Sequence, residues 1–365
     1  MKELNNLIDC ICGHYKPGIT YTAKVHNDLY FIATDCNALF SISLLTGDIK
    51  LITVFENENL YGYFLGNAFT YGRYVVVCPF NYYQIHIWDT KKNQEKNIKK
   101  ARSSNFNYEI GLYRMISIRE KLLFFPSISH DVVVLNANTG EIENKISVFD
   151  SFLHYNENGY NVFSRDLGYI YNGKIYFSMS DINFIAEYDI RLNMFLFYEL
   201  DLDEQIILSD GIEDSLYMLD VKGQIYEWNI NTHAVTKKAN IKCEGYDITW
   251  LQSTLKYGDF LYYMSPNNTF GIKYNFIENI LTIESYCNLF NIENDEEEYH
   301  FSLFDEDKNI YFISEQYNLV IYDLKNCQYK KLCLNIKDSE LEQLKQYQNS
   351  RVQKFNIGEL IYKSI

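Results

Sequence analysis

The sequence predicts an all-β protein, a β-propeller of four-stranded blades, and three observations support this prediction. A bulky residue followed by Asp, Asn or Ser and then a turn occurs seven times along the 365-residue chain. The polar members of this pattern lie 40 to 53 residues apart, which is the repeat length of propeller blades. The composition also suits strands, because 16% of the residues are aromatic and only 4 are Pro.

Each of the seven bulky-polar pairs follows an apolar, aromatic strand and precedes a turn and another strand-like segment. The polar side chain can accept a hydrogen bond from the backbone two residues on, which fixes a turn. Thr46-Gly47 and Thr139-Gly140 provide the left-handed position that such turns often need. The seven pairs are Ile42-Ser43, Trp88-Asp89, Leu135-Asn136, Tyr188-Asp189, Trp228-Asn229, Tyr274-Asn275 and Tyr322-Asp323.

Every unit has room for four short strands, and the first strand begins well before the bulky-polar pair. Seven units of four strands predict a ring of seven blades, with a pair of β-sandwiches as the main alternative. The first strands begin near Tyr21, Tyr61, Tyr108, Ser164, Ile207, Tyr246 and Tyr299.

The two ends of the chain fall outside the repeat. We expect residues 1–18 to be an N-terminal segment that can close the ring, 19–334 to form the propeller, and 335–365 to form a helix and a strand hairpin that pack on it or complete it. The helix is predicted over Asp338–Arg351, where Leu341, Leu344 and Tyr347 share one face. The segment Val352–Ser364 resembles two blade strands, so an eight-bladed ring closed by both termini is the alternative.

The Trp88-Asp89 pair resembles the dipeptide that ends the blades of WD40 propellers, and strands followed by Asp and a turn resemble kelch and quinoprotein repeats. The resemblance covers about residues 19–334. The glycine doublet of kelch repeats and the Gly-His dipeptide of WD40 repeats are missing from the sequence. The resemblance therefore implies the fold alone and transfers no functional residue.

Charge and composition limit the partners and the location. The net charge of −15 and the pI near 5.0 argue against binding to nucleic acid or an anionic membrane. Met1–Asp9 lacks the apolar core of a secretory signal, and no apolar run reaches the length of a membrane span. We therefore expect a cytoplasmic protein whose 8 cysteines are reduced.

Standard catalytic and metal-binding motifs are absent from the sequence. Cys10-x-Cys12-x-His14 has no second ligand pair, so an edge strand is favoured over a metal site. Asp305-x-Asp307-x-Asn309 resembles the start of a calcium loop but lacks its glycine, which favours an acidic turn between two strands. The basic stretch Lys91–Arg102 has no interleaved aromatic residues and is read as a solvated outer strand and loop. No metal and no cofactor are expected.

The candidate site is the rim formed by the loops that lead into the first strand of each blade. These loops supply aromatic faces, acids, one Arg and one His, which suit a peptide, a sugar or a small polar ligand. The predicted ligand-binding residues are Tyr21, Tyr61, Tyr63, Tyr108, Arg165, Tyr246, Trp250, Tyr299 and His300. If the protein is an enzyme, the candidates are His300 as general base, Glu109, Asp166 and Asp247 as acid partners, and Arg165 as an anion clamp.

These features favour a non-enzymatic propeller that binds a protein or peptide partner on its loop face, since Tyr and Arg are common at interfaces. Two alternatives remain open at this point. One is an enzyme, a lyase or a glycan-active enzyme, with a site at the mouth of the central channel. The other is a module that binds a carbohydrate or small molecule there.

Overall fold

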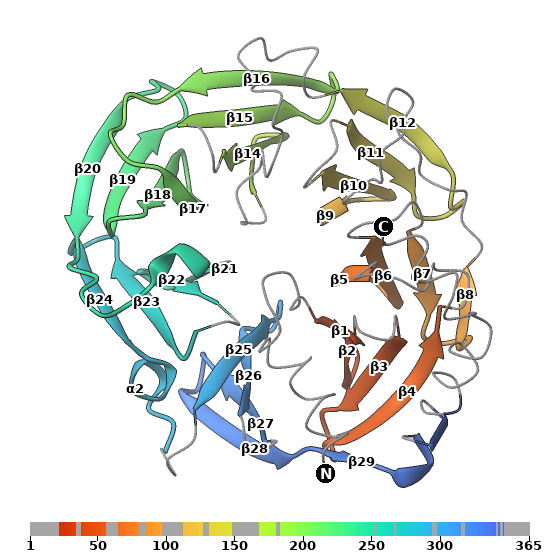
Figure 1. Ribbon diagram of the computed structural model, residues 1–365. Coiled ribbons are helices and arrows are strands. Elements are labelled where there is room, and N and C mark those ends of the chain that lie inside the picture. The colour runs from red at the N-terminus through yellow and green to blue at the C-terminus, as the bar shows by residue number, and fades with distance from the viewer. Residues whose placement is uncertain are drawn as a thin grey trace, which may run out of the picture.

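The fold is a seven-bladed β-propeller, as predicted (Figure 1). Seven antiparallel sheets surround a central axis, and the strands of each sheet follow the chain from the inside outward, so we call them A to D. The computed structural model describes residues 22–33, 38–55, 65–79, 85–96, 112–126, 131–147, 168–179, 183–251, 253–265, 268–293, 298–314, 318–340, 342–343 and 346.

The two inner strands of each blade are A and B. The A strands line the central axis, and the B strands contain the apolar runs that precede the bulky-polar pairs. The A strands are β1 (Ala23–Val25), β5 (Leu65–Tyr71), β9 (Leu112–Ile118), β13 (Tyr169–Tyr171), β17 (Ile206–Ile212), β21 (Ser253–Tyr257) and β25 (Tyr299–Phe304). The B strands are β2 (Asp28–Ala33), β6 (Tyr74–Pro79), β10 (Lys121–Pro126), β14 (Lys174–Ser178), β18 (Ser215–Asp220), β22 (Phe260–Met264) and β26 (Asn309–Ser314).

The C strands end in the bulky-polar pairs, and the D strands form the outer rim. The C strands are β3 (Ala38–Ser43), β7 (His86–Asp89), β11 (Asp131–Asn136), β15 (Phe184–Asp189), β19 (Gln224–Asn229), β23 (Phe270–Asn275) and β27 (Asn318–Asp323). The D strands are β4 (Asp48–Val54), β8 (Gln94–Lys96), β12 (Ile142–Ser147), β16 (Met194–Glu199), β20 (Val235–Asn240), β24 (Ile280–Ser285) and β28 (Gln328–Cys333).

The turn between strands C and D is built in the same way in all seven blades. The polar residue that ends strand C accepts hydrogen bonds from the backbone N–H groups two and three residues on, so the predicted role of this residue is confirmed. The residue four positions after it has a positive φ, between 50° and 79°. These residues are Gly47, Asn93, Gly140, Asn193, His233, Asn279 and Cys327.

Replacing one of these capping residues tests what the turn contributes to stability. Asn229 Oδ1 accepts hydrogen bonds from the N–H groups of Asn231 and Thr232 and from the Thr232 hydroxyl. We expect Asn229→Ala to lower the free energy of unfolding by about 1–2 kcal/mol, the usual cost of losing such a cap. Asn229→Ser keeps an accepting oxygen, as Ser43 provides in blade 1, and like Asn229→Ala it loses the hydrogen bond from Asn229 Nδ2 to Asp214, so it serves as the control in urea unfolding. Equal losses for the two variants would contradict this role.

The hydrophobic core consists of seven clusters, one between each pair of neighbouring blades. The bulky member of the repeated pair contributes to them: Trp228 and Tyr274, for example, are 1% and 0% exposed. Aromatic rings meet across these interfaces, as where Tyr176 of blade 4 lies 6.0 Å from Trp228 of blade 5. The high Tyr and Phe content of the chain therefore fills the space between the sheets.

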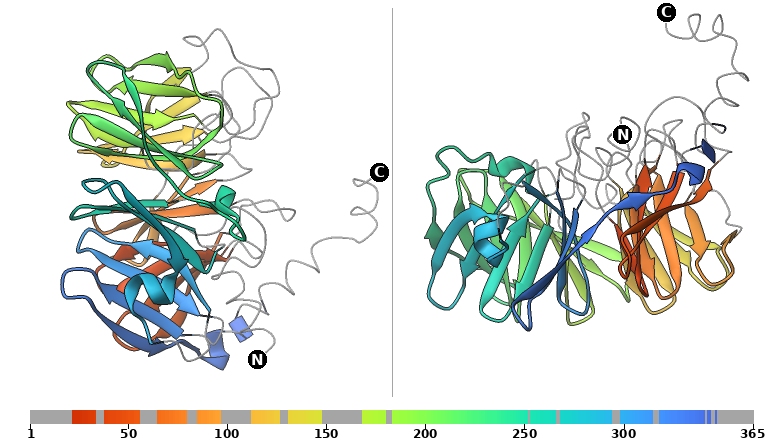
Figure 2. Two further views of the ribbon diagram at one scale, coloured as in Figure 1. Left: turned by 90° about the vertical axis from the view of Figure 1, so that its left-hand side faces the viewer. Right: turned by 90° about the horizontal axis from the view of Figure 1, so that it is seen from below.

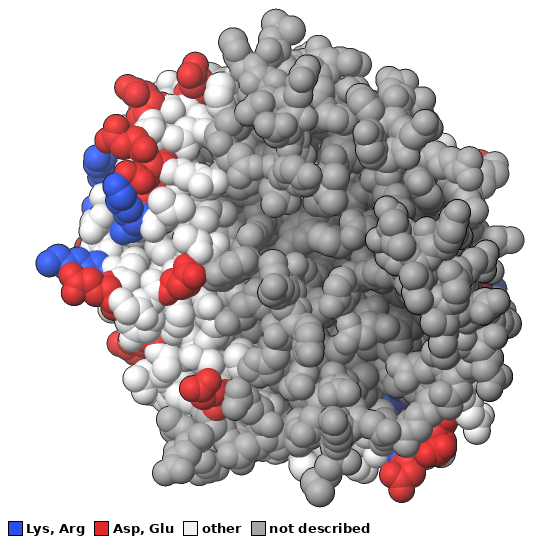
Figure 3. All heavy atoms as spheres, in the orientation of Figure 1, with Lys and Arg blue, Asp and Glu red and all other residues white. Residues whose placement is uncertain are grey.

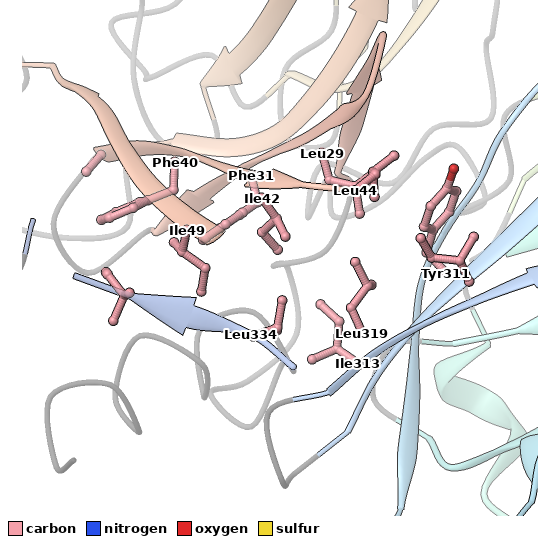
Figure 4. Packing of buried hydrophobic residues seen from close by; sticks show 13 residues of the cluster. Leu29, Phe31, Phe40, Ile42, Leu44, Ile49, Tyr311, Ile313, Leu319 and Leu334 are labelled. Atoms are coloured by element: carbon pink, nitrogen blue, oxygen red, sulfur yellow. The ribbon is translucent and has the colours of Figure 1, made fainter. Parts of the chain in front are cut away.

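The seam where blade 7 meets blade 1 closes the ring. Apolar side chains of the two blades face each other there, including Phe40 and Leu29 from blade 1 and Ile313 from blade 7 (Figure 4). After blade 7 the chain forms β29 (Asn335–Ile336), which pairs in parallel with the outer edge of β4. Blade 1 is therefore a five-stranded sheet that includes the segment after blade 7.

The helix predicted from Asp338 begins as expected, since residues 338–340 are helical. It also supports the seam, because Glu340 Oε2 accepts a hydrogen bond of 3.0 Å from the backbone N–H of Leu51 in β4. The strands proposed for an eighth blade, within Val352–Ser364, lie outside the described residues, as do residues 1–21. The described strands form seven sheets.

Candidate functional site

The two faces of the disc are formed by different connections. The loops from strand D of one blade to strand A of the next, here called D–A loops, lie on one face together with the B–C connections. The A–B and C–D turns lie on the other face, as follows from the up-and-down order of the strands (Figure 2). The residues predicted as the site belong to the D–A loops and the starts of the A strands.

The structure describes five of the predicted site residues. Tyr246, Asp247 and Trp250 lie in the D–A loop of blade 6, and Tyr299 and His300 are the first residues of β25 in blade 7. The other candidates lie outside the described residues, so their predicted roles remain untested. They are Tyr21, Tyr61, Tyr63, Tyr108, Glu109, Arg165 and Asp166.

Hydrogen bonds and packed side chains fix the conformation of the D–A loop of blade 6. It contains the short helix η3 (Ile248–Trp250), which begins where Asp247 Oδ1 accepts a hydrogen bond of 3.1 Å from the N–H of Thr249. Ile248 is 2% exposed and anchors the helix in the core between blades 5 and 6. Phe270 packs edge-on against the Tyr246 ring, with centroids 4.8 Å apart. Because Tyr246 is still 39% exposed, this loop presents an ordered aromatic ring to solvent.

The two candidates in blade 7 are buried. Tyr299 is 1% exposed and belongs to the core between blades 6 and 7. His300 is 6% exposed and pairs with Ile313 in the ladder between β25 and β26. Both side chains therefore contribute to the packed interior of the described structure.

The described part of the D–A face is acidic. Figure 3 shows Asp and Glu side chains over blades 5 and 6, at the left of the view. Of the two lysines in these connections, Lys222 is paired with Glu204 and Lys242 is exposed. The exposed acidic residues are Asp201, Asp203, Glu244, Asp247, Glu293 and Glu298.

A pocket of about 600 Å³ lies on the opposite face, at the ends of the A strands of blades 1, 2, 3 and 7. Lys24 of β1 lies in it and pairs with Asp305 and Asp307, which belong to the A–B turn of blade 7. The prediction that Asp305 lies in an acidic turn between two strands is confirmed. Its pairing with Lys24 was not predicted, because the two residues are 281 positions apart.

The side chain of Asp305 is only 6% exposed, and its carboxylate accepts several hydrogen bonds. Burial alone raises the pKa of Asp305, but hydrogen bonds from Lys24, Asn309 and Tyr311 outweigh this effect and hold the pKa below its usual value. Burial alone lowers the pKa of Lys24, but the hydrogen bond to Asp305 and the negative charge of that residue outweigh this effect and raise the pKa. Both groups are therefore charged at neutral pH.

Among the described residues, no group of three or more His, Cys, Asp or Glu side chains is placed to hold a metal ion. Cys10, Cys12 and His14 lie outside that part of the chain. The described helices include none that is long and apolar enough to cross a membrane.

Comparisons with known proteins show the fold alone. Neither protein-family models nor curated proteins match the sequence. Virginiamycin B lyase from Staphylococcus aureus has a similar structure, with a TM-score of 0.58 and 15% identity over 82% of this chain and 92% of the lyase chain. PorZ from Porphyromonas gingivalis gives a TM-score of 0.55 at 10% identity, covering 87% of this chain and 38% of PorZ. A chain of the mitotic checkpoint complex gives 0.53 at 9% identity, covering 86% and 89%.

Proposed function

We propose that this protein is a non-enzymatic propeller that binds a protein or peptide partner on its D–A face, and that the partner presents a basic segment. The observation behind this proposal is the D–A loop of blade 6, where an exposed and well-supported Tyr246 stands among acidic residues. An exposed Tyr offers a large contact area at little entropic cost, and carboxylates around it attract and orient Lys and Arg.

The rigidity of this loop supports its use as a binding surface. Its backbone is tied by the Asp247 cap and by the bond of 3.3 Å from Asn268 Nδ2 to the Asp247 carbonyl oxygen. A surface that is already ordered loses little entropy when a partner binds. The similarity to a chain of the mitotic checkpoint complex shows that this fold occurs in a protein assembly.

Peptide selection tests the proposal. We expect a displayed random peptide library, selected on the intact protein, to yield peptides rich in Lys and Arg whose affinity falls as the salt concentration rises. Tyr246→Ala and Glu244→Lys should each weaken the selected peptides about 10-fold, because one removes the aromatic contact and the other reverses a charge. Affinities are measured by fluorescence anisotropy.

Asp259→Lys is the matched control. Asp259 is exposed like Glu244 but lies in the A–B turn of blade 6, on the opposite face. The proposal is wrong if this variant loses as much affinity as Glu244→Lys, or if the selected peptides are neutral or acidic.

The pocket on the opposite face favours a second function, the binding of a small polar ligand. Its volume of about 600 Å³ is within the range of small-molecule sites. A ligand with hydroxyl groups fits its chemistry, since Lys24 donates and Asp307 accepts hydrogen bonds there. The enzyme alternative has less support, because its proposed base His300 is buried and the similarity to the lyase concerns the fold.

A further inference from the structure

The pocket opposite the D–A face has a lining that selects the charge of its ligand. It lies where the inner strands β1, β5, β9 and β25 end beside the central axis (Figure 1). Acidic side chains from the A–B turn of blade 7 and aromatic side chains from blades 2 and 7 line it. Its volume of about 600 Å³ accommodates a ligand of the size of a sugar.

The charge of Lys24 is neutralised within the wall of the pocket. Its ammonium group contacts Asp305 and lies 3.2 Å from the carboxylate of Asp307. The side chain of Asp305 is only 6% exposed, and its carboxylate also accepts hydrogen bonds from Asn309 and Tyr311. Lys24 and Asp305 therefore form a structural ion pair, and neither charge remains for a ligand.

The remaining charge of the lining is negative and belongs to Glu306 and Asp307. Both side chains are exposed, Asp307 to 75%. Among the described residues Glu306 has no hydrogen-bond or ion-pair partner. With His26 neutral, the lining contains three carboxylates and the single ammonium group of Lys24. This excess of negative charge attracts a cation and repels an anion.

The aromatic side chains favour an organic cation over a metal ion. Tyr71 of blade 2 and Phe304 of blade 7 line the pocket, and both are half-buried. The Tyr71 hydroxyl donates a hydrogen bond of 3.0 Å to the carbonyl oxygen of Arg119, and the ring stacks on Tyr74 with centroids 6.4 Å apart. Organic ammonium groups bind to aromatic faces as well as to carboxylates. No three acidic, His or Cys side chains of the described chain are placed to hold a metal ion.

We propose that this pocket binds a small organic amine that carries hydroxyl groups. The inference rests on the second function proposed above and adds the charge of the ligand. The ammonium group of the ligand pairs with Glu306 and Asp307. Its hydroxyl groups bond on the side of blade 3, where the exposed hydroxyl of Ser117 has no hydrogen-bond partner in the described part of the chain.

Three probes that differ at one end test the charge of the ligand. Glucamine, sorbitol and gluconate share a polyol chain, which ends at neutral pH in an ammonium, a hydroxyl or a carboxylate group. In ligand-observed NMR titrations of the full chain, we expect glucamine to bind about 10-fold more tightly than sorbitol. Gluconate should not bind. The preference for glucamine should decrease as the salt concentration rises, because salt screens exposed charges.

Substitutions in the lining test where the probes bind. The double variant Glu306→Gln, Asp307→Asn should lower the affinity for glucamine about 10-fold, to that of sorbitol, because it removes both exposed carboxylates. Ser117→Trp places a large side chain in the pocket and should abolish binding of both probes. Glu120→Gln is the matched control, since Glu120 is exposed in the A–B turn of blade 3 but does not line the pocket. Unchanged thermal unfolding shows that the variants are folded.

The outcomes separate this inference from the function on which it rests. If sorbitol binds as tightly as glucamine and Ser117→Trp abolishes both, the pocket binds a polar ligand without selecting a cation, and only the inference is wrong. Tighter binding of gluconate, or a glucamine affinity that the double variant leaves unchanged, also overturns the inference. If none of the three probes binds, the inference and the second function are both wrong.

Discussion

Gly47→Ala is expected to destabilise the protein more than alanine at those left-handed glycines that have open space around them, such as Gly72. A β-carbon at Gly47 would lie 2.2 Å from the backbone carbonyl oxygen of Cys333, and the φ of +79° is itself unfavourable for alanine. The carbonyl of Gly47 also accepts a hydrogen bond of 3.1 Å from Asn335 N, the first residue of β29. The β-carbon therefore displaces the backbone that closes the ring.

We expect the free energy of unfolding of Gly47→Ala to fall by about 3–4 kcal/mol, measured in urea. The backbone strain alone accounts for about 1–2 kcal/mol. Gly72→Ala is the control, since Gly72 also has a positive φ, +56°, but has nothing within 4 Å of the added carbon. Hydrogen exchange should increase at β4 and β29 in the first variant only. Equal losses in the two variants would show that the seam tolerates the displacement.

The seven-fold repeat was predictable from the sequence because each copy is determined by interactions between residues that are close in the chain. The residue that ends strand C caps the turn within its own segment, so a pattern in the sequence identifies it in all seven blades. The left-handed position of the same turn was harder to predict. Gly47 and Gly140 are recognisable there, whereas His233 and Cys327 adopt the same conformation without a glycine signal.

Other features depend on closure of the ring, which leaves no local pattern. β29 has only two residues, Asn335 and Ile336, too few for periodicity, and its partner β4 is almost 300 residues earlier in the chain. Tyr299 and His300 were predicted at the rim because they begin a strand. Tyr299 is buried because it packs in the core between blades 6 and 7, whereas His300, 6% exposed, lies in the ladder with β26. Much of the predicted site lies outside the described residues, so its assembly stays a prediction.

Loss of the Lys24 ammonium group should destabilise the inner side of the seam between blades 1 and 7. Lys24 of blade 1 pairs with Asp305 and Asp307 of blade 7, and the Asp305 side chain is only 6% exposed. Lys24→Met leaves that carboxylate buried with only the neutral donors Asn309 and Tyr311. Removing one partner of a buried pair costs about 3–5 kcal/mol. Because Lys24 is 19% exposed and water screens part of the charge, we expect about 2–3 kcal/mol.

The pH dependence of the free energy of unfolding distinguishes the contribution of this ion pair from that of apolar packing. The pKa of Asp305 is lowered in the folded protein, so its contribution is fully present above its unfolded pKa of about 3.9 and is lost as the pH falls through the folded value. The pKa of Lys24 is raised, so its contribution is present below about pH 10.4 and is lost as the pH rises through the folded value.

Asp305→Asn should therefore reduce the free energy of unfolding at pH 7 and make progressively less difference below about pH 4, where the carboxylate takes up a proton first in the unfolded chain and then, at lower pH, in the folded protein. The double variant with Lys24→Met should lose less than the sum of the single losses, because Lys24→Met leaves the Asp305 carboxylate without its cation and Asp305→Asn leaves Lys24 with only the exposed Asp307. Asp307→Asn is the control, since Asp307 is 75% exposed and its loss should cost little. Additive losses, or an equal effect of Asp305→Asn at pH 7 and pH 3, would mean that apolar packing and β29 close the ring without help from this pair.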